Sequence, residues 1–142
     1  MKCVQLIDVP ALLAFDVNER FVPGEGIWLV SSRFQGRFAG VVEGPIGCRE
    51  LAIRELTCHS DDSAIVRQCG EEFVDTRLGH LHWALLGSVG TVTRGTWLYA
   101  YARDANGNLV PVCVLWHPEH GAFVDSPVMI VRYARAHVLV HR

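Results

Sequence analysis

Lysine is almost missing from this sequence. Of the 142 residues only Lys2 is a lysine, and the other twelve basic residues are arginines. Fifteen acidic residues leave a formal net charge of −2, so there is no excess of positive charge to attract a phosphate backbone or an anionic membrane surface. The charge therefore argues against a nucleic-acid partner, and we expect no membrane partner.

Long apolar runs are also missing. No run approaches the roughly 20 residues that a membrane-spanning helix needs. Residues 1–8 have neither the long apolar stretch nor the small-residue cleavage site of a secretory signal. The five cysteines are odd in number and form no CxxC pair, which is not the pattern of a secreted disulfide scaffold. We expect reduced thiols and a cytoplasmic protein.

Half of the residues are apolar and one fifth are charged, a composition typical of a folded globular chain. No repeat, low-complexity tract or linker divides it, so we expect one domain over residues 1–142. Short segments rich in strand-forming residues, including 89–93 and 128–133, predict seven to ten strands with one or two helices. The expected fold class is α+β and β-rich, with a mainly antiparallel sheet or a partly closed barrel.

The clearest helix signal follows residue 60. Ser60 or Asp61 can cap the helix, and acidic residues crowd its first turn, where they favour the helix dipole. Apolar residues then recur at helical spacing on one face: Ile65, Val66, Cys69 and Phe73. Gly79 is a suitable residue to end this helix.

The clearest strand signal is a hairpin. Two β-rich segments, 96–103 and 109–116, flank Asn106 and Gly107, and this dipeptide favours a two-residue turn. Such a turn predicts that Tyr101 faces Val112 and that Trp97 faces Trp116. Because proline has no N–H to donate, the second strand should be a sheet edge, or bulged, near Pro111.

Both faces of this hairpin are apolar. In the predicted register Trp97, Tyr99, Tyr101 and Trp116 share one face, with Arg103 near the turn. These side chains form either part of the core or a surface that binds bases, sugars or a protein partner. An apolar ribbon must be covered on both sides, or must bind a partner or a second copy. The candidate binding residues are Trp97, Tyr99, Tyr101, Arg103, Pro111, Trp116, His117 and His120.

Histidines form the candidate metal site. His80 and His82 alternate with apolar residues as in a strand, which would point both rings to one face. Neutral imidazoles bind zinc or iron. A metal site needs a third ligand, for which the sequence offers Glu119, Cys58 and His59 as candidates without favouring one. The alternative is that these are ordinary surface or half-buried histidines, and we expect no other cofactor.

The segment His82-Trp83-Ala84-Leu85-Leu86-Gly87 resembles the strand that carries the catalytic histidine in circularly permuted papain-like acyltransferases and hydrolases. The resemblance implies a cysteine nucleophile activated by His82. Cys58 and Cys69 precede this histidine, so they would serve only in the unpermuted order, and Cys113 lies within the predicted hairpin.

Other motifs of known chemistry do not occur, among them the P-loop, GxGxxG, the Gly-x-Ser-x-Gly elbow and the EF-hand loop. The leading hypothesis is therefore a small non-enzymatic binding protein that acts through a protein–protein surface, as inhibitors and immunity proteins do. The alternative is a Cys/His or metal-dependent enzyme built around a strand that carries His80 and His82.

Overall fold

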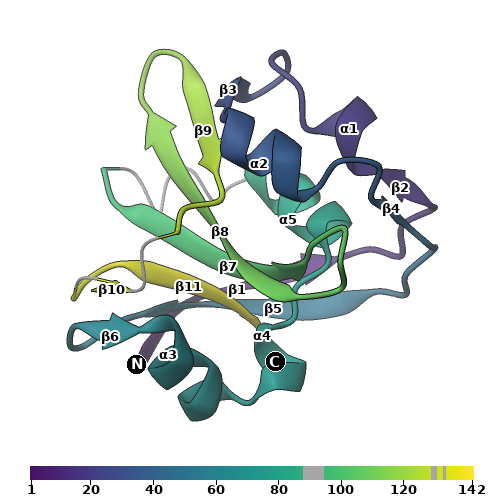
Figure 1. The fold of residues 1–142 in the computed structure, drawn as a ribbon. Coiled ribbons are helices and arrows are strands. Elements are labelled where there is room, and N and C mark those ends of the chain that lie inside the picture. Colours follow the sequence, from purple (N-terminus) through teal and green to yellow (C-terminus); the bar gives the residue numbers. More distant parts are fainter. Residues whose placement is uncertain (88–94, 129–130, 133) are drawn as a thin grey trace.

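A seven-stranded sheet organises the chain (Figure 1). The computed structural model describes residues 1–87, 95–128, 131–132 and 134–142. The strands of the sheet are, in order across it, β1 (Lys2–Val9), β5 (Arg49–Glu55), β11 (His137–His141), β7 (Trp97–Arg103), β8 (Leu109–His117), β9 (Gly121–Asp125) and β3 (Ile27–Val30). Strands β1 and β3 form its two edges, so the sheet is open rather than a closed barrel.

The sheet is mixed. Four of its neighbouring pairs are antiparallel, whereas β11 runs parallel to β7 and β3 runs parallel to β9. Two smaller two-stranded sheets pair β2 (Phe15–Asp16) with β4 (Val42–Glu43) and β6 (Ser60–Asp61) with β10 (Val131–Arg132). This architecture confirms the β-rich α+β fold class.

The described residues contain five short helices, more than the one or two that were expected. They are α1 (Val17–Arg20), α2 (Ser32–Arg37), α3 (Asp62–Cys69), α4 (Glu71–Val74) and α5 (Leu78–Leu86). None of them is long and apolar enough to cross a membrane. The strand expected over 89–93 lies outside the described residues, and so does part of the strand expected over 128–133.

The helix predicted after residue 60 starts where its capping signal indicates. The Asp61 carboxylate accepts a hydrogen bond from the Ala64 backbone N–H at 2.6 Å, as an N-cap residue does. The helix ends earlier than predicted because Gly70 adopts a φ of +88°, a conformation that interrupts the helix and that glycine adopts without steric cost. Gly79 does not end this helix; it lies in the first turn of α5.

The hairpin forms as predicted, but its turn is one residue longer. Asp104 and Asn108 close a loop of residues 105–107, with Gly107 at a φ of +79°. The Asp104 carboxylate accepts hydrogen bonds from the backbone N–H groups of Asn106 and Asn108, both at 2.9 Å. These bonds stabilise the longer loop, in which a glycine of positive φ follows the turn.

The longer loop shifts the predicted register by one residue. Tyr101 faces Pro111 rather than Val112, and Trp97 faces Leu115 rather than Trp116. A one-residue shift moves one strand's side chains to the other face, so the predicted grouping of Trp116 with the other three aromatic residues is wrong. Strand β9 pairs with β8 only over residues 113–117, which confirms that β8 lacks a second strand neighbour near Pro111.

The hairpin is covered on both faces (Figure 1). One face, with Leu98 and Val112, packs into a core that includes Phe34 of α2 and Leu81 of α5. The other face, with Tyr99, Tyr101 and Cys113, packs against Ile65 of α3 and Val74 of α4. An apolar ribbon enclosed in this way needs no partner to cover it.

Candidate functional site

The predicted aromatic surface of the hairpin lies within the core. Tyr99 and Tyr101 are 7% and 1% exposed. Trp97 is half-buried and contacts the ring of Phe123, whereas Trp116 packs into the core on the opposite face. These residues therefore belong to the core, which was one of the two interpretations of the sequence. They form no continuous binding surface.

Tyr101 and Pro111 do line a pocket of about 470 Å³ between α3 and the hairpin. The Tyr101 hydroxyl donates to the Asp62 carboxylate at 2.7 Å, and the Arg132 guanidinium donates to the same carboxylate at 2.9 Å. Burial raises the pKa of Asp62 despite these two contacts. Since both oxygens of Asp62 are already bonded, we interpret this network as a link that holds α3 and β10 to the sheet.

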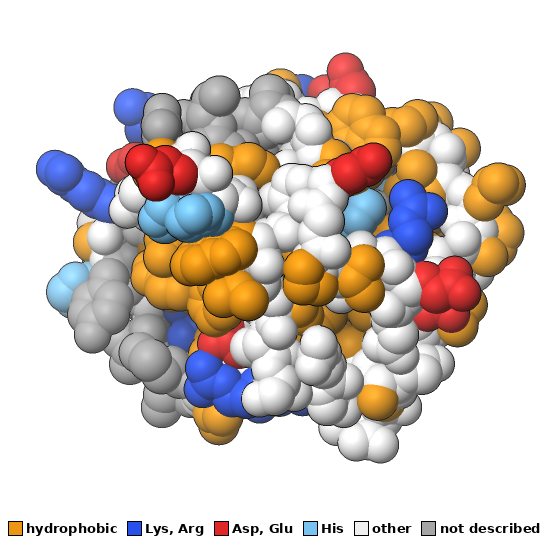
Figure 2. Space-filling view, turned by 90° about the horizontal axis from the view of Figure 1, so that it is seen from above, with side chains coloured by type: hydrophobic (Ala, Val, Ile, Leu, Met, Phe, Trp, Pro, Cys, Tyr) orange, Lys and Arg blue, Asp and Glu red, His pale blue; other side chains and the backbone are white. Residues whose placement is uncertain are grey.

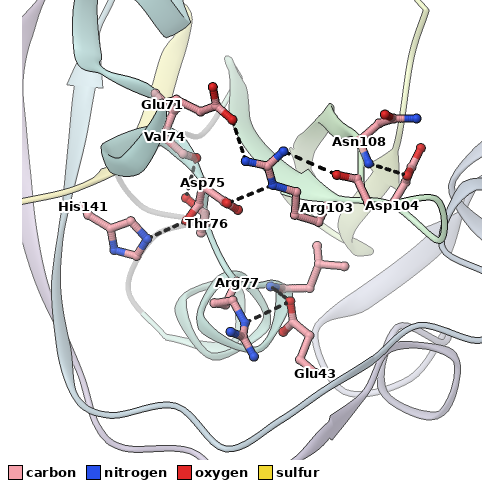
Figure 3. Close-up of polar contacts among 12 residues, drawn as sticks. Glu43, Glu71, Val74, Asp75, Thr76, Arg77, Arg103, Asp104, Asn108 and His141 are labelled. Carbon is pink, nitrogen blue, oxygen red and sulfur yellow. Dashed lines mark hydrogen bonds and ion pairs between the residues drawn. The ribbon is translucent and has the colours of Figure 1, made fainter.

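Arg103, another predicted binding residue, is held in ion pairs (Figure 3). Its guanidinium contacts the carboxylates of Glu71 at 2.6 Å and Asp75 at 3.0 Å. On the far side of this segment His141 donates from Nε2 to the Asp75 carbonyl at 2.7 Å. Arg103 therefore connects the hairpin to α4. Because its guanidinium is already paired with two carboxylates, it is less available to bind a ligand.

His80 and His82 lie on α5, so the prediction that a strand carries them is wrong. The Glu43 carboxylate starts this helix by accepting the backbone N–H groups of Leu78 at 2.9 Å and Gly79 at 2.8 Å. Residues two apart on a helix point to opposite sides, since each residue turns the helix by about 100°. The helix therefore separates the two rings that a strand would have brought together.

The two histidines lie in different surroundings. The ring of His80 is 6.3 Å from that of His141, centre to centre, and His82 lies 5.3 Å from both Phe15 and Phe21. Nowhere in the described part of the chain do three His, Cys, Asp or Glu side chains gather as they would around a metal ion. The arrangement offers neither histidine the further ligands that a zinc or iron site requires.

Burial keeps both rings neutral. The pKa of His80 is lowered to about 4, chiefly by burial. The nearby positive charges of His141, Arg49 and Arg77 also lower this pKa, and their effect exceeds the opposite effect of the Gly47 backbone. Burial likewise lowers the pKa of His82, with a smaller contribution from Arg20. The lowered pKa favours the neutral form of both rings at pH 7.

The strand that the resemblance to papain-like enzymes implies is also absent at residues 82–87, which belong to α5 and its C-cap. Such enzymes need a cysteine whose pKa is lowered. Here burial raises the pKa of Cys113 to about 12 and also raises the pKa of Cys69. The geometry therefore does not assemble an activated thiol from these residues.

His117 and His120 meet a residue that sequence reasoning missed, Trp28 of the edge strand β3. The two imidazoles stack with ring centres 4.5 Å apart, and the Trp28 ring lies 4.9 Å from His120 and 5.3 Å from His117. The Nδ1 atom of His117 accepts the backbone N–H groups of Glu119 and His120, both at 3.2 Å. These bonds occupy the lone pair of Nδ1, so this atom is not free to bind a metal.

Exposed apolar side chains gather around the same end of the molecule. Among the described residues eleven large hydrophobic side chains are exposed, and six come from two short segments, 13–29 and 83–86. We call these six the apolar face: Leu13, Val22, Trp28, Leu29, Trp83 and Leu86. Figure 2 shows several groups of hydrophobic side chains at this end, with polar and backbone atoms between them and histidine atoms beside some of the groups.

Two adjacent pockets lie in the apolar face. A pocket of about 130 Å³ is lined by Leu13, Trp83 and other largely apolar residues. A second pocket, of about 220 Å³, is lined by Val22 with Glu19 and Glu25. Arg20, His82 and Leu86 line both pockets, so the two hollows share one wall.

The parts of this face come together only in the folded chain. Leu13 and Val22 precede Trp83 and Leu86 by about seventy residues in the sequence. A Cβ atom at Gly26 would lie 3.0 Å from Leu86, so the loop before β3 packs directly on the end of α5. The local signal for this face in the sequence is the segment of strand β3, which has four apolar residues and no charged residue.

Comparison of the chain with protein-family models, curated proteins and solved structures found no match.

Proposed function

We propose that this chain is a small non-enzymatic binding protein that acts through a protein–protein surface, as inhibitors and immunity proteins do. The apolar face is that surface. One observation carries the proposal: six of the eleven exposed large hydrophobic side chains belong to two segments that fold against each other. Contiguous exposed apolar patches on a folded chain mark interaction sites.

The chemistry of the face supports the same conclusion. Tryptophan and arginine dominate the binding energy of protein interfaces, and here Trp28, Trp83 and Arg20 lie in or beside the apolar face. Glu19 and Glu25 add charge at its border. An apolar centre with a polar rim is the usual organisation of a protein interface.

The face also differs from the predicted surface. The candidate residues His117 and His120 belong to it through their contacts with Trp28. The hairpin residues Tyr99 and Tyr101 do not, because the helices cover them. The alternative of an enzyme was based on a strand that carries His80 and His82, and both residues lie on helix α5 instead.

The test compares three forms of the protein. The face variant carries Leu13→Asp and Leu86→Asp, both at exposed positions (86% and 45%). The control variant carries Val4→Asp and Leu6→Asp, which are also exposed (38% and 46%) but lie on the edge strand β1, outside the lining of both pockets. Circular dichroism and thermal unfolding first establish that each form is folded.

Each form is then immobilised on a solid support and incubated with an extract of the source cells. The captured proteins are identified by mass spectrometry. We expect a partner that wild type and control variant retain and the face variant loses. Calorimetry with the purified partner should show a loss of at least about tenfold in affinity, or about 1.4 kcal/mol, for the face variant only. Equal affinity of all three forms would refute the proposal.

A further inference from the structure

We propose that the partner presents a basic side chain next to a large apolar one, and that the basic group binds between Glu19 and Glu25 while the apolar group fills the neighbouring pocket. This inference rests on the proposed function and specifies the chemistry of the partner. It follows from the charges that line the two pockets of the apolar face.

The carboxylates of Glu19 and Glu25 have no ion pair with any side chain that the structure describes. The nearest candidate, Arg20, lies instead over the ring of Phe15, with its guanidinium carbon 5.5 Å from the ring centre. Glu19 and Glu25 line a pocket of about 220 Å³ together with a single arginine, so acidic residues outnumber basic ones in its lining.

The pocket as a whole is negative. Its charged lining residues are Glu19, Glu25 and Arg20, and the remaining titratable residue is His82. The ring of His82 is 7% exposed, and burial lowers its pKa, so it adds no positive charge at neutral pH. An acidic group entering this pocket would meet like charges, whereas an arginine or lysine would meet opposite ones.

The walls of the pocket suit the rest of a basic side chain. Val22 and Leu86 line it beside the two carboxylates. Long basic side chains bury their methylene groups on such apolar surface and keep the charged group in contact with acceptors. An arginine can also donate to carboxylates in bidentate geometry.

The neighbouring pocket lacks an acidic residue. Its lining is Leu12, Leu13, Ala14, Phe15, Gly79, Trp83 and Leu86, together with Arg20 and His82. An apolar side chain gains free energy when it leaves water for such a lining. Because the two pockets share one wall, adjacent residues of a single partner segment can occupy both.

Two labelled nonapeptides serve as probes. Both contain the same leucines, and two positions beside them carry arginine in one peptide and glutamate in the other. Fluorescence anisotropy measures the binding of each to the intact chain. We expect the arginine peptide to bind at least about tenfold more tightly than the glutamate peptide, and we expect added salt to reduce the difference.

Two variants with the same change in net charge locate the effect. Glu19→Lys/Glu25→Lys should weaken binding of the arginine peptide at least about tenfold. Asp8→Lys/Glu72→Lys, at exposed positions outside the pocket, should change it by less than about twofold. Thermal unfolding establishes that both variants remain folded.

The outcomes separate the two proposals. Equal binding of both peptides, lost in a Leu86→Asp variant, would refute the basic partner and leave the apolar face as a binding surface. Equal loss in both charge variants would also refute the basic partner, since it would show only a general charge effect. Peptide binding that is unchanged by Leu86→Asp would refute the proposal that the apolar face is the binding surface. No binding of either peptide up to about 1 mM would overturn the inference.

Discussion

Replacement of His80 by leucine should make the stability of this protein less dependent on pH. His80 is fully buried on α5, and neither of its ring nitrogens has a hydrogen-bond partner of good geometry. Burial lowers its pKa from 6.5 to about 4. Leucine keeps the helix and much of the volume but cannot take up a proton.

The sign follows from where the proton binds. Below pH 6.5 the unfolded chain protonates His80, whereas the folded chain does so only near pH 4. The free energy of unfolding therefore falls as the pH falls through this range. The difference of 2.5 pKa units corresponds to a total of about 3 kcal/mol, of which about 2 kcal/mol is lost by pH 5.

The assay is chemical denaturation at a series of pH values from 7.5 to 5. His82 and His137, whose pKa values burial also lowers, add to the slope in both proteins, so the difference between wild type and His80→Leu isolates His80. Near pH 7.5 the variant should be as stable as wild type or about 1 kcal/mol more stable, because an unpaired buried polar group is removed.

A matched control is Leu85→Ala on the same helix. It creates a cavity and should lower stability by about 2–5 kcal/mol, but it removes no titratable group and should keep the wild-type slope. If the difference between wild type and His80→Leu is the same at pH 7.5 and pH 5, the assigned role of His80 in acid sensitivity is wrong.

Two further predictions concern α5 and the thiols. Glu43→Ala should destabilise the protein by about 1–2 kcal/mol in denaturant titrations, because two N–H groups at the start of α5 lose their acceptor; Glu43→Gln, which keeps an acceptor oxygen, should lose less, and equal losses would contradict the capping role. Native Cys113, with a pKa raised to about 12, should resist iodoacetamide at pH 8 while exposed Cys48 and Cys58 react, as followed by mass spectrometry; labelling of Cys113 at the same rate would contradict its burial.

Local chemistry made part of the fold predictable. The start of α3 follows from Asp61, whose carboxylate can bond a free N–H of the first turn wherever the helix lies. The strands of the hairpin follow from β-forming residues on both sides of a turn. Each of these signals involves groups only a few residues apart, so the sequence states them directly.

In the hairpin two turn lengths compete, and the outcome decides the register of the strands. Asn106 and Gly107 favour a two-residue turn, but the carboxylate of Asp104 bonds two N–H groups and stabilises a loop of three. The difference between these turns is small, and yet it decides which side chains share a face. Burial under α3 and α4 then determined that Tyr99 and Tyr101 belong to the core.

His80 and His82 show where periodicity fails. In residues 80–86 apolar side chains occur at nearly every position, so the pattern fits a strand and a buried helix equally well. The helix forms because Glu43, far away in the sequence, caps it and because its sides pack on Phe15 and against His141. Packing of this kind has no local signal.

The sequence by itself determined the composition, the small net charge, the β-rich class and the capping of α3, because these depend on residue type or on near neighbours. The tertiary structure decided which apolar residues remain exposed. Leu13 and Leu86 line one pocket, and the loop before β3 packs on the same end of α5. Exposure is a property of all neighbours in space, most of which lie far apart along the chain.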